Sequence, residues 1–153
     1  MSFTSPLPDI ELPCTTIFDM VFDTALDTVL DTVSSTSRTA ITEIDTGRSA
    51  TYGELRERAE RVAAGLMARG VGRGDVVALR LLNSVDFAAG LLGIARAGAG
   101  AALLSPLLTE REAAELTLLA SATAELTAAD IAGAAVGART SAAPTHPRPA
   151  PED

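Results

Sequence analysis

Short apolar runs alternate with helical patterns in the second half of the chain, and this alternation constrains the fold more strongly than any other feature. The run 76–82 is apolar apart from Arg80, as expected of a parallel strand that is covered on both faces. A helix is expected over 85–97, with apolar residues almost all round, followed by a second short buried strand over 99–104. The pattern therefore predicts two parallel strands joined by a buried helix.

The same alternation continues toward the C-terminus. Thr109 and Glu112 have the spacing of a reciprocal capping box, which predicts a helix running through Leu119. A third strand is predicted over 123–127 and a weak helix over 128–137. Strands and helices that alternate with short connections are typical of an α/β fold. We therefore predict a partial parallel sheet flanked by helices.

A hairpin and a well-marked helix are predicted ahead of this unit. Two strands over 39–44 and 49–52 flank a four-residue turn that contains Gly47. Thr51 and Glu54 form a second capping box and begin a helix that a glycine at position 70 is placed to end. The apolar face of this helix consists of Leu55, Ala59, Val62, Ala63, Leu66 and Met67.

A four-residue near-repeat covers 18–33 and predicts an N-terminal helix. Residues four apart are neighbours on a helix, so the repeat gives one apolar ridge and one acidic stripe. We expect the stripe to face water, because like charges at this spacing repel. A calcium site is the alternative, but carboxylates along one straight helix do not converge as those of a calcium loop do. The ridge is Phe18, Phe22, Leu26 and Leu30, and the stripe is Asp19, Asp23, Asp27 and Asp31.

Gly70, Gly72 and Gly74 invite comparison with a dinucleotide-binding loop. The third glycine comes one residue early for the G-x-G-x-x-G fingerprint. The segment also follows a helix and enters a strand, whereas the fingerprint follows a strand and opens a helix, where phosphate meets the helix N-terminus. We interpret these glycines as a helix stop followed by a tight turn.

Net charge and the N-terminal sequence exclude several classes of partner. The formal net charge of −8 argues against nucleic acid, which is held mainly by Lys and Arg. No apolar run approaches the roughly 20 residues that span a bilayer, so we expect no membrane partner. The first residues lack the basic and apolar regions of a signal peptide, and one cysteine permits no internal disulfide. We therefore expect a cytoplasmic location.

The residue types that most often carry catalysis are scarce. All 12 basic residues are arginines, which removes any phosphate-loop or Schiff-base lysine. His146, the only histidine, lies among prolines that would not hold a catalytic base in place. Cys14 has no histidine or lysine near it in sequence to activate it, and one Cys with one His cannot form a structural zinc site. We therefore assign no catalytic, cofactor-binding or metal-binding residue, and we expect no cofactor for this chain.

Five segments, in the expected order and spacing, resemble the N-terminal part of the adenylate-forming enzymes. These enzymes include acyl- and aryl-CoA ligases, luciferases and the adenylation domains of peptide synthetases. The resemblance implies a family that joins a carboxylic acid to ATP and then passes the acyl group to coenzyme A, with ATP, magnesium and coenzyme A used by the full-length enzymes. The segments are 3–10, 50–55, 70–79, 83–87 and 96–99, and the first is similar to the opening of 4-coumarate:CoA ligases.

The chain departs from this family in two ways. It reads Ala-Leu-Leu-Ser-Pro over 102–106, where the family usually has a strand end like Val-Pro-Leu-Asn-Pro. It also stops before the family's phosphate loop with its lysine, its aromatic-acid pocket, its ribose-binding Asp and its C-terminal domain with a catalytic lysine. No functional residue of the family can therefore be carried onto a position here.

These observations predict an N-terminal fragment of a 4-coumarate:CoA ligase-like protein that is inactive alone. It would comprise an extended arm over 1–15, an incomplete N-terminal ligase subdomain over 16–138 and a disordered tail over 139–153. One half of a split ligase and a non-catalytic interaction module are the alternatives, so enzymatic activity stays an open question. Few helices are available to cover the strands, so we expect exposed apolar surface, with self-association or a complementing ligase polypeptide.

Overall fold

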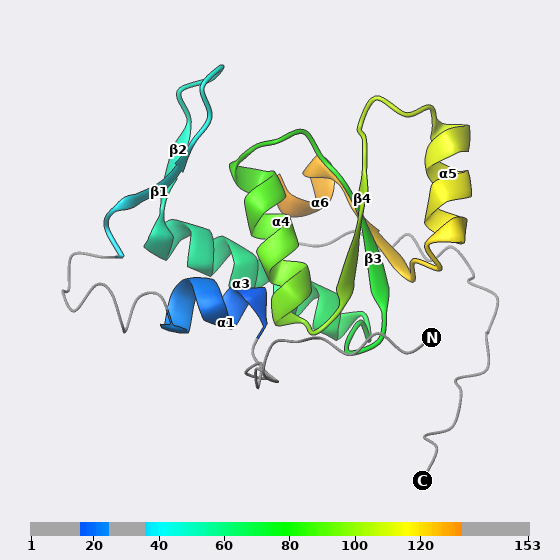
Figure 1. Cartoon of the computed structure of the whole chain (residues 1–153), viewed down its shortest axis with the longest axis horizontal. Coiled ribbons are helices and arrows are strands. Elements are labelled where there is room, and N and C mark those ends of the chain that lie inside the picture. The colour runs from blue at the N-terminus through cyan, green and yellow to red at the C-terminus, as the bar shows by residue number, and fades with distance from the viewer. Residues whose placement is uncertain (1–15, 25–35, 133–153) are drawn as a thin grey trace, which may run out of the picture.

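The computed structural model describes residues 16–24 and 36–132, and it contains one antiparallel hairpin and one parallel sheet with helices around it (Figure 1). The predicted arm over 1–15 and tail over 139–153 lie outside the described residues, as do Cys14 and His146. The elements are α1 (Ile17–Asp19), η1 (Met20–Thr24), β1 (Thr39–Thr42), β2 (Ser49–Thr51), α3 (Tyr52–Ala68), β3 (Val76–Arg80), α4 (Val85–Arg96), β4 (Gly100–Leu104), α5 (Glu110–Leu119), β5 (Ala124–Leu126) and α6 (Ala128–Ala132).

The three-stranded sheet has the order β4-β3-β5, and β3 pairs in parallel with both neighbours. This confirms the predicted α/β fold with a parallel sheet. The centre of β3 is covered on both faces, since Val77, Ala78 and Leu79 are all fully buried. Alternate residues point to opposite faces of a strand, so Val77 and Leu79 face α3 and α4, with which they form the main core.

Helices α3 and α4 pack closely on one another beside the sheet. A Cβ added at Gly93 of α4 would lie 2.6 Å from the Cβ of Val62 and 2.8 Å from the carbonyl oxygen of Ala59, both in α3. Only glycine therefore fits at this crossing without a shift in the backbone. The buried face of α3 is the one that the sequence predicts, except that Met67 is 52% exposed. Met67 directly follows buried Leu66, and a step of one residue turns about 100° away from the core.

The predicted starts of α3 and α5 and the predicted end of α3 are confirmed. Thr51 and Thr109 each form a reciprocal capping box, with Glu54 and Glu112 respectively, and Ser84 caps α4 by accepting a hydrogen bond from the amide of Phe87. After α3, Gly70 adopts a φ of +82°, and the amide of Val71 donates to the carbonyl of Leu66. This is the glycine-terminated end expected when a residue must enter the left-handed region.

The N-terminal helix is confirmed only in its first part. Phe18 and Phe22 of the predicted ridge are buried against α3 and α4, with ring centroids 4.7 Å apart. Asp19 does not face open water as predicted: it accepts hydrogen bonds from Thr16 and lies 3.7 Å from the guanidinium of Arg96. A capping role therefore replaces the solvated one at this position. The side chains of the rest of the ridge and stripe, at 23, 26, 27, 30 and 31, lie outside the described residues.

The prediction that β4 is buried is wrong. Leu103 of β4 is 58% exposed, although its register partner Leu79 in β3 is fully buried. The cause is strand order: β5 adds on the other side of β3, so β4 is an edge strand of the described sheet. Helix α5 has one buried residue, Ala113, and its Leu118 and Leu119 are exposed. The expectation of exposed apolar surface is confirmed here.

Candidate functional site: a polar network at the start of α4 and its adjoining groove

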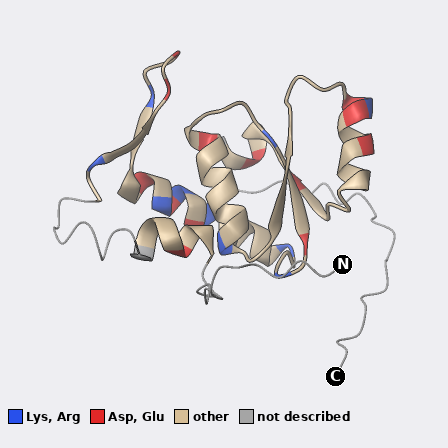
Figure 2. Cartoon of the chain, viewed as in Figure 1, with Lys and Arg blue, Asp and Glu red and all other residues tan. Residues whose placement is uncertain are grey.

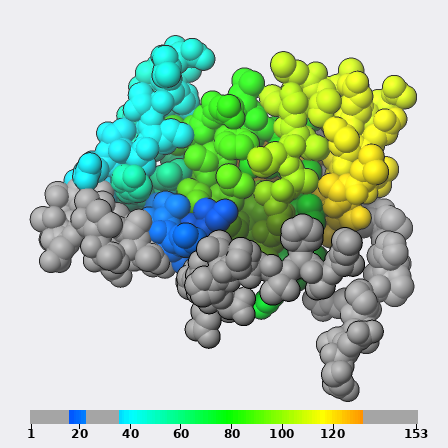
Figure 3. All heavy atoms as spheres, in the orientation of Figure 1, coloured from blue at the N-terminus to red at the C-terminus, as the bar shows by residue number. Residues whose placement is uncertain are grey.

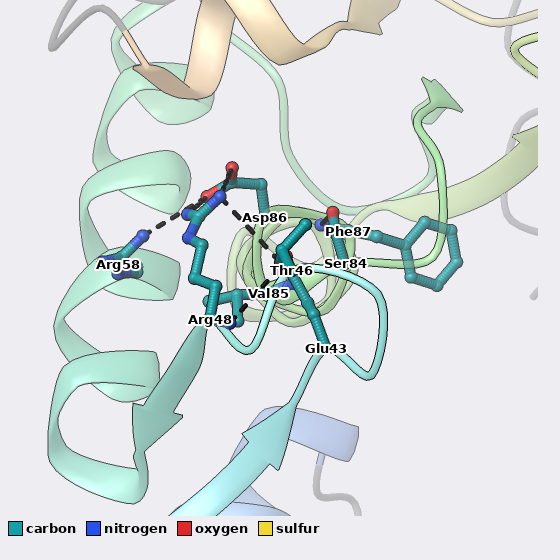
Figure 4. Close-up of polar contacts among 8 residues, drawn as sticks. All are labelled: Glu43, Thr46, Arg48, Arg58, Ser84, Val85, Asp86 and Phe87. Carbon is teal, nitrogen blue, oxygen red and sulfur yellow. Dashed lines mark hydrogen bonds and ion pairs between the residues drawn. The ribbon is translucent and has the colours of Figure 1, made fainter.

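A network of charged side chains joins the hairpin to the first turn of α4 and to α3 (Figure 4). The two guanidinium nitrogens of Arg48, beside β2, donate to the two carboxylate oxygens of Asp86 at 2.9 and 2.7 Å. Arg58 of α3 donates to the same carboxylate at 3.3 Å. The bidentate Arg–carboxylate geometry fixes the orientation of both groups, so three elements distant in sequence meet at Asp86.

Glu43, at the end of β1, anchors the hairpin to the N-terminus of α4. Its carboxylate accepts a hydrogen bond from the backbone amide of Val85 at 2.8 Å and another from the hydroxyl of Thr46 at 2.6 Å. The first amides of a helix lack partners within the helix, and a carboxylate there also interacts favourably with the helix dipole. Glu43 thus caps α4 from outside, beside the Ser84 cap.

The network keeps its charges fixed around neutral pH. The hydrogen bond from Arg48 lowers the pKa of Asp86 below its ordinary value. The hydrogen bond from Thr46, followed by that from Val85, lowers the pKa of Glu43. The hydrogen bond to Asp86 also raises the pKa of Arg48. A general acid or base works best with a pKa near the working pH, and these groups are shifted the other way. The network is therefore built to hold elements together rather than to transfer protons.

A groove of about 700 Å³ opens between the hairpin and α4. In the space-filling view, the atoms of the hairpin stand beside those of α4 (Figure 3). The groove combines apolar side chains with the acidic residues of the hairpin turn, so it suits an apolar segment better than a phosphate group. Its lining residues include Ile41, Glu43, Ile44, Phe87, Ala88 and Leu91.

A second polar cluster explains Arg80, the charged residue in an otherwise apolar strand. Arg80 points away from α3 and α4, and its guanidinium contacts Glu125 of β5 and Glu110 of α5, each at 3.0 Å. The hydrogen bond to Glu110 is the main reason that the pKa of Arg80 is raised. Both carboxylates that contact Arg80 come from the chain itself. It therefore anchors α5 to the sheet at the carboxyl ends of the strands.

The glycines at 70–74 form a helix stop followed by a turn, which is the interpretation given from the sequence. Gly70 and Gly74 both have φ in the left-handed region, at +82° and +90°, and end α3 and turn the chain into β3. The amide of Gly72 donates to the carboxylate of Asp75 at 2.8 Å, so it does not point to an open anion site.

Metal ligands are similarly not gathered. Within 16–24 and 36–132, no three His, Cys, Asp or Glu side chains lie close enough together to hold an ion. The same residues contain no helix of the length and apolarity needed to cross a bilayer.

No site residue is assigned from the sequence, and the Arg48–Asp86–Arg58 network is not predicted from it. The one available signal is Asp86 in the first turn of a predicted helix, where a carboxylate is favourable.

Comparison with known proteins identifies the family. The family model described as AMP-binding enzyme matches residues 32–151. The 4-coumarate–CoA ligase 3 of Oryza sativa subsp. japonica is 36% identical over 110 residues, which are 72% of this chain and 19% of that protein. The 4-coumarate–CoA ligase 4 of Arabidopsis thaliana is 35% identical and is matched over 74% of this chain and 20% of its own length.

Solved structures have the same fold. The anthranilate CoA ligase AuaEII, in complex with anthranoyl-AMP, superposes with a TM-score of 0.62 at 24% identity, over 74% of this chain and 20% of that one. The N-terminal domain of FACL13 from Mycobacterium tuberculosis superposes with a TM-score of 0.61 at 28% identity, over 72% of this chain and 26% of that domain. The sheet and its helices thus have the fold of the N-terminal part of adenylate-forming enzymes.

The chain belongs to the AMP-binding enzyme family, and its relatives include 4-coumarate–CoA ligases. This confirms the resemblance seen in the sequence. The chain spans 19% and 20% of the length of the two plant ligases that it matches.

Proposed function

We propose that this chain provides the N-terminal scaffold of an adenylate-forming acyl-CoA ligase of the 4-coumarate–CoA ligase type. In such a ligase, a carboxylic acid reacts with ATP to give an acyl-adenylate, and the acyl group then passes to coenzyme A. The observation that carries the proposal is the AMP-binding match over 32–151. The similarity to the plant 4-coumarate–CoA ligases, at 36% and 35% identity, supports an aromatic or related acid as the substrate class.

The role proposed for the described residues is mechanical. The network around Asp86 fixes the hairpin against α3 and α4, and the cluster around Arg80 fixes α5 and β5 on the sheet. Both clusters would give a rigid base for ligand-binding segments supplied by the rest of a ligase fold. We also propose that the protein acts in the cytoplasm. A single cysteine permits no internal disulfide, which fits a reducing compartment.

We further propose that the 153-residue chain does not form an acyl-adenylate alone. That step moves negative charge onto departing pyrophosphate, and it requires positioned cations or backbone amides around that charge. The sequence has no lysine, and Arg48, Arg58 and Arg80 are already engaged with carboxylates. These three arginines are therefore not available to bind a pyrophosphate group.

The test is ATP–pyrophosphate exchange with the purified 153-residue protein, magnesium and a panel of aryl and fatty acids. A complete 4-coumarate–CoA ligase assayed in parallel controls for the reagents, and circular dichroism confirms that the chain is folded. The proposal predicts exchange no higher than in buffer. Acid-dependent exchange well above buffer would contradict it. Exchange that arises only after a second polypeptide with the remaining ligase segments is added would establish one half of a split ligase.

A further inference from the structure

The outer edge of β4 has the features of a strand-pairing surface. Within the described residues β4 pairs with β3 alone, so one side of its backbone has no strand partner. Natural edge strands are commonly protected by charge, proline or a bulge. The five residues of β4 are Gly100, Ala101, Ala102, Leu103 and Leu104, and they include neither charge nor proline (Figure 2). Their pairing with β3 is also regular along its length.

Side chains along this edge are apolar and open to solvent. Leu103 lies beside Leu79 in the register, on the face of the sheet that α4 covers, yet it is 58% exposed while Leu79 is fully buried. Ala101 lies two residues earlier on the same face and is exposed as well. The core therefore stops at β3 and leaves an apolar margin along β4.

We infer that β4 pairs antiparallel with β4 of a second copy of this chain, across a two-fold axis at Ala102. In this register Leu103 of each copy lies opposite Ala101 of the other, and Leu104 lies opposite Gly100. Each large side chain meets a small one, so the edge is complementary to itself, as a two-fold interface requires. The chain has a net charge of −8, but none of that charge lies on β4, so like charges do not meet directly at the pairing.

Pairing of this kind would give one continuous sheet of six strands and cover both exposed edges. It does not depend on the proposed ligase role, because it uses only β4 and its neighbours. The competing occupant of the edge is a strand from the remainder of a longer ligase. That alternative predicts a 153-residue chain that stays monomeric, so the two can be separated by measuring mass in solution.

The experiment is sedimentation equilibrium on the wild-type chain, Leu103→Lys, Ala101→Lys and the control Ile44→Lys. Ile44 lies in the hairpin turn and is exposed, so its substitution adds the same charge away from β4. We expect a dimer for wild type and for Ile44→Lys. Either lysine on β4 should weaken dimerisation at least about tenfold, because it places a charged side chain where an apolar one would be covered on pairing, and the lysines of the two copies would lie on the same face of the joined sheet. Circular dichroism confirms that each variant is folded.

Amide hydrogen exchange provides a second reading at the residue level. If β4 pairs with a second copy, its outward amides are protected at high protein concentration and exchange faster on dilution, whereas the amides of β3 do not change. A wild-type chain that remains monomeric at every soluble concentration would overturn the inference. A dimer that is unaffected by both β4 lysines would also overturn it.

Discussion

The two faces of β3 are covered by different helices and to different extents. On one face, Val77 and Leu79 are fully buried beneath α3 and α4, whose contact is so close that glycine is required at position 93. On the other face, α5 contributes one buried residue, Ala113, and its Glu110 also contacts Arg80 of β3. Apolar packing is extensive on the α3–α4 face, whereas on the α5 face it is limited and is accompanied by an ion pair between α5 and β3.

This difference locates the part of the molecule that carries its stability. Apolar burial contributes about 25 cal/mol for each Å² removed from water, whereas exposed ion pairs contribute about 0–1 kcal/mol each. The α3–α4 face should therefore unfold only with the whole domain. The α5 face should open locally, at a lower free energy.

The largest effect should come from removing a core side chain on the α3–α4 face of β3. Leu79→Ala deletes a fully buried side chain, and such changes cost about 2–5 kcal/mol of the free energy of unfolding. The matched change on the α5 face is Leu119→Ala, at a position that is 80% exposed. It should change stability by no more than about 0.5 kcal/mol. Urea unfolding measures both. Equal costs for the two variants would show that the faces do not differ.

The glycine at the helix crossing should be next in size. Gly93→Ala places a Cβ within 2.8 Å of a backbone oxygen of α3, and overpacking of this kind costs about 1–3 kcal/mol. Gly72→Ala is the control, because a Cβ there meets nothing within 4 Å. Thermal unfolding should show a clear loss for Gly93→Ala and little change for Gly72→Ala. An unaltered melting temperature for Gly93→Ala would mean that α3 and α4 can separate without loss.

The two capping boxes allow a comparison with the same chemistry in two settings. Loss of a threonine N-cap typically costs about 1 kcal/mol. Thr51→Ala should lower global stability by about that amount, because α3 is part of the main core. Thr109→Ala should mostly unravel α5, with a smaller effect on the global transition. Urea unfolding gives the global value, and exchange of the α5 amides reports the local one. A larger loss of global stability for Thr109→Ala than for Thr51→Ala would show that α5, and not α3, contributes more to the stability of the domain.

The smallest effect concerns pH and the network on the hairpin. Asp86 has a lowered pKa in the folded chain, so its contribution to stability is present above the ordinary aspartate value of 3.8 and is lost as the pH falls through the lower folded value. Asp86→Asn should therefore be less stable than wild type at pH 7, by about 0.5–1 kcal/mol for a partly exposed pair.

The stability gap between the two proteins should then narrow as the pH is lowered below that value. Glu115→Gln is the control, because Glu115 forms an exposed pair with Arg111 within α5. Its stability at pH 7 should be close to that of wild type, because an exposed ion pair contributes little. A gap for Asp86→Asn that stays constant from neutral to acidic pH would show that the charge of Asp86 does not stabilise the fold.

Features set by nearby residues were predictable from the sequence. The helix starts at Thr51 and Thr109 depend on partners three residues away, and the end of α3 depends on a glycine at its own terminus. The parallel strands follow from their apolar composition. The family could also be recognised from short segments in the right order, and the match over 32–151 confirms it.

Features set by distant residues were not predictable. Arg48 and Asp86 are 38 residues apart, and nothing in either local sequence indicates that they meet. The exposure of β4 follows from strand order, because β5 joins the sheet on the far side of β3. A run of apolar residues has the same composition in the middle of a sheet and at its edge. The sequence therefore indicates a strand but not which of its sides is left open.

The most direct test of the difference between the two faces is native-state hydrogen exchange across the whole chain. Our account predicts that amides in β3 and α4 exchange only when the domain unfolds globally, with opening free energies equal to that from urea unfolding. Amides of α5 should exchange through local opening at distinctly lower free energy, and Glu110→Gln should lower it further without changing β3. Protection of α5 equal to that of β3 and α4 would contradict the account.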